Sequence, residues 1–201
     1  MKFFDFLFAS LSTFFNPVCA ESQPAHLHEF TTPSVMVIVG TDRPDSQTRT
    51  VAENLAAAYQ QKGMATSLYD VADFSPELYA PTAYAERPAD FKKFNDELLK
   101  TDVVVIVSPE YNAAIPAPLM RVINLLSFPD SFTGKKFVIV TDSVSSYGAT
   151  RAHEQLKKTL LDLHAVVDDA LNLKIAHVDQ VTKAGSSLYA EHAEKLAHLQ
   201  K

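Results

Sequence analysis

Five short apolar runs in this chain are each followed by a segment with helical periodicity, and this alternation restricts the fold more than any other feature. The first run, Ser34–Gly40, is rich in β-branched residues and ends in glycine. The later runs lie at Met64–Val71, Val103–Val107, Phe137–Thr141 and within Ala165–Ile175. Runs of this length and composition are typical of buried parallel strands.

Helices are predicted between these strands from apolar residues three and four positions apart. The first helix carries Val51, Leu55 and Tyr59 on one face and ends at Lys62-Gly63, and residues 73–88, with three prolines, are expected to form a long loop. The later helices are expected around Phe91–Leu99, Pro118–Ser127, Ala152–Leu163 and Leu188–Leu199. Strict alternation favours right-handed crossovers, so we expect an α/β three-layer sandwich with a five-stranded parallel sheet covered by helices on both faces.

Length and composition suit one globular domain, which we place at residues 34–201. The chain has 201 residues, 47% of them hydrophobic, and a net charge of −6, which argues against nucleic acid as its main partner. The single cysteine, Cys19, excludes a disulfide framework, and seven scattered histidines show no metal-ligand spacing. We therefore predict no metal site.

The first 33 residues differ from the rest of the chain and allow two interpretations. Aromatic and leucine side chains between Phe3 and Phe15 fall on one helical face, which predicts an amphipathic helix that contacts a partner subunit or a membrane through residues 1–15. Alternatively, residues 1–20 are a signal peptide cleaved after Ala20. Asp5 within the apolar stretch favours a retained helix and a cytoplasmic protein; cleavage would indicate export. Residues 21–33 are predicted to be a linker.

Ligands of open parallel sheets bind beyond the carboxyl ends of the strands, where the strand order reverses. For a strand order of 2-1-3-4-5, a common order of such sheets, that point lies between the loops after the first and third strands, residues 40–48 and 108–116. These loops are also the most chemically distinctive stretches of the chain, so we place the site there.

The loop after the first strand has the groups that a phosphate requires. Thr41, Ser46 and Thr48 supply hydroxyls, Arg43 supplies a guanidinium, and a helix begins directly after them. The alternative is an ordinary strand-to-helix turn in which Ser46 is the helix N-cap. Neither a Walker A motif nor G-x-G-x-x-G is present, and two aspartates oppose anion binding.

The loop after the third strand is suited to the edge of a flat heteroaromatic ring. Glu110, Tyr111 and Asn112 offer a carboxylate, a phenol and an amide, and the flanking Pro109 and Pro116 stiffen the backbone. The alternative is a proline-rich connector whose polar groups face solvent.

Together these motifs resemble the NADPH-dependent FMN reductase family, flavodoxin-like proteins that include quinone, chromate and azo-dye reductases. The first loop, G-T-D-R-P-D-S-Q-T at residues 40–48, is similar to the family's G-S-x-R-x-x-S-x-N. The third-strand loop, P-E-Y-N-A-A-I-P-A-P-L-M at residues 109–120, is similar to P-E-Y-N-x-S-x-P-x-x-L-K. A serine-rich turn at residues 143–148 and the following G-A-T-R-A and Q-L also match, so the resemblance covers residues 34–175.

The resemblance implies a flavodoxin-like fold, with the strand order 2-1-3-4-5, and a set of FMN-binding residues. The phosphate group would be held by Thr41, Arg43, Ser46 and Thr48. The isoalloxazine ring would be bordered by Pro109, Glu110, Tyr111 and Asn112 and, on its other edge, by Ser143, Ser145, Ser146, Tyr147 and Gly148. The chain departs from the family at Thr48, Ala114 and Met120, and a side chain replaces one of the glycines expected before Gly148.

The same resemblance implies an NAD(P)H-dependent reductase that passes hydride equivalents through FMN to a quinone, free flavin or similar small acceptor. NADPH or NADH would be the reductant, and a homodimer or homotetramer is implied. No catalytic acid or base is assigned. Two alternatives stay open: a flavodoxin-type electron carrier, which the missing flavodoxin phosphate loop disfavours, and a binding module that has lost its flavin.

Overall fold

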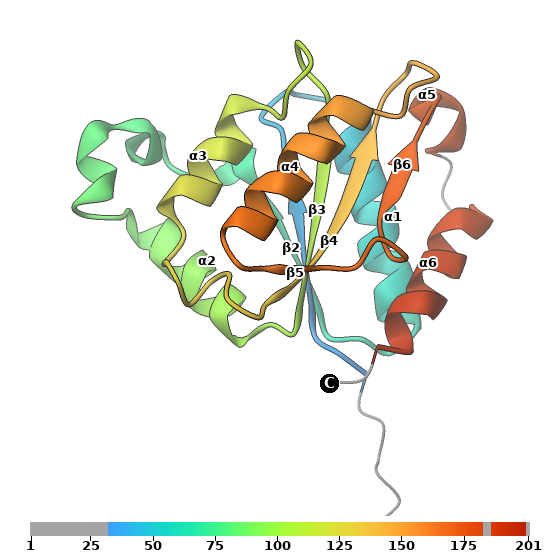
Figure 1. The fold of residues 1–201 in the computed structure, drawn as a ribbon, viewed down its shortest axis with the longest axis horizontal. Coiled ribbons are helices and arrows are strands. Elements are labelled where there is room, and N and C mark those ends of the chain that lie inside the picture. The colour runs from blue at the N-terminus through green and yellow to red at the C-terminus, as the bar shows by residue number, and fades with distance from the viewer. Residues whose placement is uncertain (1–31, 183–185, 200–201) are drawn as a thin grey trace, which may run out of the picture.

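The computed structural model describes residues 32–182 and 186–199, and the predictions for residues 1–31 lie outside this range. A parallel sheet forms the middle of three layers (Figure 1), and its strands follow the order β2-β1-β3-β4-β5. This is the predicted order. Helices α2, α3 and α4 cover one face of the sheet, and α1 and α6 cover the other (Figure 1). The elements lie at β1 Val35–Val39, α1 Gln47–Gln61, β2 Thr66–Asp70, α2 Ala89–Lys100, β3 Val103–Pro109, α3 Ala117–Leu125, β4 Lys136–Asp142, α4 Thr150–Asp162, β5 Val166–Val167, β6 Leu173–Ile175, α5 Val178–Val181 and α6 Ser187–Ala197.

Two apolar clusters, one on each face of the sheet, form the core. Alternate residues of β1 point to opposite faces, so Met36 and Ile38 join the cluster beneath α2, α3 and α4. Val35, Val37 and Val39 join the cluster beneath α1 and α6. Every residue of β1 and β3 is buried, as a parallel sheet covered by helices on both faces requires.

A fifth strand lies within Ala165–Ile175, as predicted, but a sixth strand that was not predicted lies there as well. The segment forms two short strands, β5 and β6, which both pair with β4. Between them the chain turns at Asp168 and Asp169, and the side-chain oxygen of Asn172 accepts a hydrogen bond from Ile139 N of β4 at 2.8 Å. This side-chain hydrogen bond takes the place of a hydrogen bond between strand backbones at the break.

Residues 73–88 are also more regular than the predicted loop. Three 3₁₀ helices, at Val71–Asp73, Pro76–Tyr79 and Pro81–Tyr84, lie between β2 and α2. Two of them begin at a proline, whose fixed φ and missing N–H suit the first position of a helix. Arg121 of α3 fastens this segment, because its Nε and Nη2 donate to the carbonyls of Leu78 and Ala80, both at 2.8 Å. Helix α5 was not predicted.

Candidate functional site

The loops after β1, β3 and β4 meet at the carboxyl edge of the sheet, as the sequence predicts. Parallel register pairs Pro109, the last residue of β3, with Asp142, the last residue of β4. The hydroxyls of Thr41 and Tyr111 lie 3.0 Å apart and join the loops after β1 and β3. Residues 70 positions apart in sequence are therefore neighbours at this edge.

Gly40 allows the chain to pass close to β3 and α3 where it leaves β1. A Cβ at this position would lie 2.9 Å from both Leu119 Cδ2 and the carbonyl oxygen of Val107. The amide of Gly40 instead donates to that carbonyl at 2.7 Å. Because the close contact includes backbone, only glycine allows the chain to leave β1 in this way.

Helix α1 offers the features of an anion site at its start. Ser46 is its N-cap and accepts a hydrogen bond from Arg49 N at 3.2 Å, as the structural interpretation of this residue predicts, while its role at a phosphate stays a prediction. The first turn carries no acidic residue. The free N–H groups and the positive end of the helix dipole therefore lie beside this loop without a carboxylate in that turn.

The predicted phosphate-binding side chains are in three different situations. Thr41 is buried, and its hydroxyl accepts a hydrogen bond from Arg43 N at 3.2 Å. The guanidinium of Arg43 is exposed and has no hydrogen bond or ion pair within the described part of the chain. Thr48 is also buried, and its hydroxyl donates to Asp142 Oδ2 at 3.0 Å. Arg43 is thus the group most available to a ligand.

Asp142 is a buried carboxylate that the sequence analysis missed, because the fourth strand was predicted to end at Thr141. Its side chain is 3% exposed, and within the described residues Oδ1 has no hydrogen-bond partner. Burial raises the pKa of Asp142 to about 6, although the hydrogen bond from Thr48 acts in the opposite direction. The sequence does contain a signal for this carboxylate, because Asp142 directly follows four apolar strand residues and Thr141.

The loop after β3 folds back on itself as a tight hairpin. Tyr111 N donates to Ala114 O at 2.9 Å, and Ala114 N donates to Tyr111 O at 3.0 Å. Asn112 and Ala113, the two residues at the tip, have φ of 52° and 66°. Two left-handed residues in succession are the geometry of a type I′ turn, which asparagine tolerates well. The tip is exposed, while Pro109 beneath it is buried.

Glu110 contacts the start of α4. Its Oε2 accepts from the backbone N–H groups of Arg151 and Ala152 at 2.9 and 3.2 Å, and Oε1 accepts from Arg151 Nε at 2.7 Å. These bonds replace a side-chain cap, because the N-cap residue of α4 is an alanine. Desolvation alone would raise the pKa of Glu110, but the hydrogen bonds from Arg151 and Ala152 outweigh it and lower that pKa. The role of Glu110 beside a ring stays a prediction.

The serine-rich turn after β4 lies at the same edge. The hydroxyls of Ser143 and Ser145 form a hydrogen bond of 2.8 Å, and Gly148 has φ of +58°. The hydroxyl of Thr141 donates to the carbonyl of Gly148 at 3.1 Å, which fixes the end of the turn to the strand. Ser146 and Tyr147 are exposed, and Tyr147 keeps 76% of its surface. The side chain that replaces a glycine of the family pattern therefore points away from the core.

A family model described as NADPH-dependent FMN reductase matches residues 33–178, which include all three loops. The chain belongs to this family. The loop residues Gly40, Glu110 and Tyr111 thus lie in the matched part of the chain.

Curated relatives carry names consistent with the family. A quinone reductase of Pseudomonas putida is 31% identical over 134 residues, which cover 65% of this chain and 70% of the relative. A quinone reductase of Escherichia coli is 30% identical over 138 residues, 66% of this chain and 72% of the relative. FerB from Paracoccus denitrificans, a flavoenzyme NAD(P)H:(acceptor) oxidoreductase, superposes with a TM-score of 0.66 at 21% identity, covering 82% of this chain and 95% of that one. The last comparison supports the fold alone.

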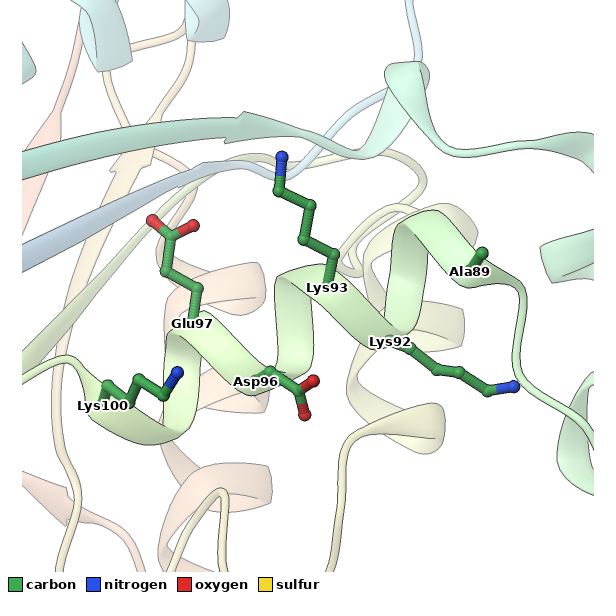
Figure 2. Close-up of a pocket in the computed structure, with 6 residues that line it drawn as sticks. All are labelled: Ala89, Lys92, Lys93, Asp96, Glu97 and Lys100. Carbon is green, nitrogen blue, oxygen red and sulfur yellow. The ribbon is translucent and has the colours of Figure 1, made fainter.

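A hollow of about 540 Å³ lies away from this edge, along α2 (Figure 2). All the residues that line it belong to α2, and apart from Ala89 they are charged, with both signs present: Ala89, Lys92, Lys93, Asp96, Glu97 and Lys100. Lys92 and Asp96 point away from Lys93 and Glu97 in Figure 2. Because one helix supplies the whole lining, we regard this hollow as a solvated helix face.

The described residues, 32–182 and 186–199, bear on metal ligation and on membrane spans. Within these ranges no three histidine, cysteine or acidic side chains come together in a way that would hold a metal ion. In the same ranges no helix is long and apolar enough to cross a membrane.

Proposed function

We propose that this chain binds FMN at the carboxyl edge of its sheet and uses NAD(P)H to reduce a quinone. The family match over the three loops carries this proposal. The names of the curated relatives favour a quinone over free flavin as the acceptor. When bound, FMN would supply the hydride and electron transfer itself, and the protein would supply binding, orientation and polarity.

The residues of this edge fit such a ligand. Arg43 and the free N–H groups at the start of α1 would bind the phosphate, with Ser46 holding that turn in place. The bond between Thr41 and Tyr111 would keep the phosphate loop and the hairpin after β3 in fixed relation. The turn at residues 143–148 would border the ring from the side of β4. No residue of the chain needs to act as an acid or base in this scheme.

The flavodoxin-type carrier and the binding module without flavin are the competing functions. The family match favours a reductase over a carrier, and a flavodoxin phosphate loop is missing from residues 40–48. The homodimer or homotetramer and the cytoplasmic location, both predicted above, are kept as parts of this proposal.

The proposal is tested by titrating FMN into the purified full-length protein and into its variant Arg43→Ala, with the fluorescence of FMN as the readout. Loss of one charge-assisted contact costs about 1.5–3 kcal/mol, so binding of FMN should weaken roughly ten- to a hundredfold. Lys62→Ala is the matched control: Lys62 caps the far end of α1, where it pairs with Glu194.

Riboflavin lacks the phosphate and should bind both variants equally. Equal FMN binding by both variants would place the phosphate elsewhere. No FMN binding by the unchanged protein, with no oxidation of NADH or NADPH in the presence of a quinone, would refute the proposed function.

A further inference from the structure

Asp142 is the one feature of the carboxyl edge that the proposed function does not explain. It ends a central strand, it is almost fully buried, and one of its oxygens lacks a partner within the described residues. A buried unpaired carboxylate oxygen is costly, and such groups are found more often at functional sites than elsewhere. The chain therefore keeps an unfavourable group directly beside its predicted phosphate loop.

Among the described residues, Asp142 has no cationic partner, and the hydroxyl of Thr48 is the group that favours its charged form. From α1 it receives the hydrogen bond of the Thr48 hydroxyl. On α6, burial chiefly raises the pKa of the Tyr189 phenol, and the nearby negative charge of Asp142 adds to this effect. Its register neighbours on β3 and β6, Pro109 and Ile175, are uncharged. On α5 and its cap, His177 and Asp179 are exposed to solvent.

The predicted phosphate loop itself carries three charged residues, Asp42, Arg43 and Asp45. Asp42 and Asp45 would repel the phosphate, and Arg43 would attract it. An ionised Asp142 behind Thr48 would add a third negative charge in a poorly solvated position, where electrostatic interactions are stronger than in water. Removing this charge by protonation would favour the bound phosphate.

We propose that Asp142 takes up a proton when a phosphate group binds at the loop after β1, so that it tunes the affinity of this loop according to pH. This inference rests on the proposed function and extends it to the control of cofactor binding. Asp142 acts through Thr48 and the start of α1 and is a positioning residue that does not touch the ligand.

Hydrogen bonding at Thr48 works in the same direction. An ionised carboxylate only accepts, so Thr48 must donate its single hydroxyl proton to Asp142 Oδ2. An Asp142 protonated on Oδ2 can donate to Thr48 Oγ1 instead, and the proton of Thr48 then becomes free for another acceptor. Uptake of a proton therefore removes a negative charge and frees a donor at the first turn of α1. The pKa of Asp142, raised to about 6 by burial, places this change within the range of ordinary assays.

Binding of FMN and riboflavin to the full-length protein at pH 5 and pH 8, compared between wild type and Asp142→Asn, tests this inference. If phosphate raises the pKa of Asp142 by one unit, its affinity differs about tenfold between the two protonation states, because the coupling is reciprocal. The ratio of the FMN dissociation constants, wild type over variant, should be about one at pH 5 and about ten at pH 8. The ionisation of the FMN phosphate itself cancels in this ratio.

Three further measurements complete the design. Riboflavin should give a ratio near one at both values of pH, because it lacks the phosphate. Asp102→Asn is the matched control and should behave as wild type: Asp102 lies at the amino end of β3, where it accepts from Ser34 N at 2.7 Å. Thr48→Val removes the hydrogen bond that lowers the pKa of Asp142, so the midpoint of the pH dependence should move upward.

An unchanged ratio at pH 5 and pH 8, or the same change with riboflavin, would overturn the inference while leaving the proposed function intact. Failure of every variant and of the wild type to bind FMN would refute the proposed function itself, and this inference with it.

Discussion

The variant Asp142→Asn should change how the stability of the protein depends on pH, even without a ligand. The pKa of this carboxyl rises from 3.8 to about 6 on folding, and one unit corresponds to 1.36 kcal/mol. The unfolded chain releases the proton near pH 4, whereas the folded chain keeps it up to about pH 6. The favourable contribution is therefore complete below pH 4 and is lost as pH rises through 6, for a total of about 3 kcal/mol.

Urea unfolding of the wild type and the variant between pH 4 and pH 8 measures this effect. The two proteins should differ least at pH 4. Above pH 7 the variant should gain up to about 3 kcal/mol relative to the wild type, because an amide carries no charge to be buried. The difference between the proteins is the relevant quantity, since all other titrating groups contribute equally to both. A difference that stays constant from pH 4 to pH 8 would refute the reasoning.

Three other predictions concern contacts described above. Glu110→Ala should lower the free energy of unfolding by about 1–3 kcal/mol, because it leaves two N–H groups of α4 without their acceptor. Arg151→Ala should lower it by less than about 1 kcal/mol, because that guanidinium is largely exposed. Equal losses in urea unfolding would contradict this prediction. Gly40→Ala should cost about 1–3 kcal/mol in the same assay, since its new methyl group meets a backbone carbonyl at 2.9 Å. Burial lowers the pKa of His192, so below about pH 6.5 the unfolded chain binds a proton that the folded chain does not bind, and the free energy of unfolding should fall. In His192→Gln this fall should be shallower. An identical fall in both proteins would argue against His192 as its cause.

Local sequence patterns were sufficient to predict the layers, and the strand order came with the resemblance to flavodoxin-like proteins. Val35–Val39 and Val103–Val107 are so rich in β-branched residues that no other local structure competes, and right-handed crossovers then limit the possible orders. The position of the candidate site follows from the same topology. Thr41 and Tyr111 were placed near one another because the rule for parallel sheets concerns strand ends and requires no knowledge of side chains.

The features that escaped prediction depend on contacts between distant segments. The contact between the Glu110 carboxylate and the start of α4, 41 residues further along the chain, was not predicted, and the role of Glu110 at a ligand edge stays a prediction. Asp142 was missed because its partner, Thr48, is 94 residues away. The 3₁₀ helices between β2 and α2 depend on Arg121 of α3, so prolines alone could not distinguish them from a loop.

The break between β5 and β6 also bears on how the protein behaves at high concentration. An edge strand with a long row of unpaired N–H and C=O groups is a template for strands of other molecules, and folded proteins avoid it by shortening or interrupting such strands. Here the edge beside β4 consists of two- and three-residue pieces, and Asn172 occupies the gap between them. This side of the sheet therefore offers little to an incoming strand, which protects the chain from aggregation.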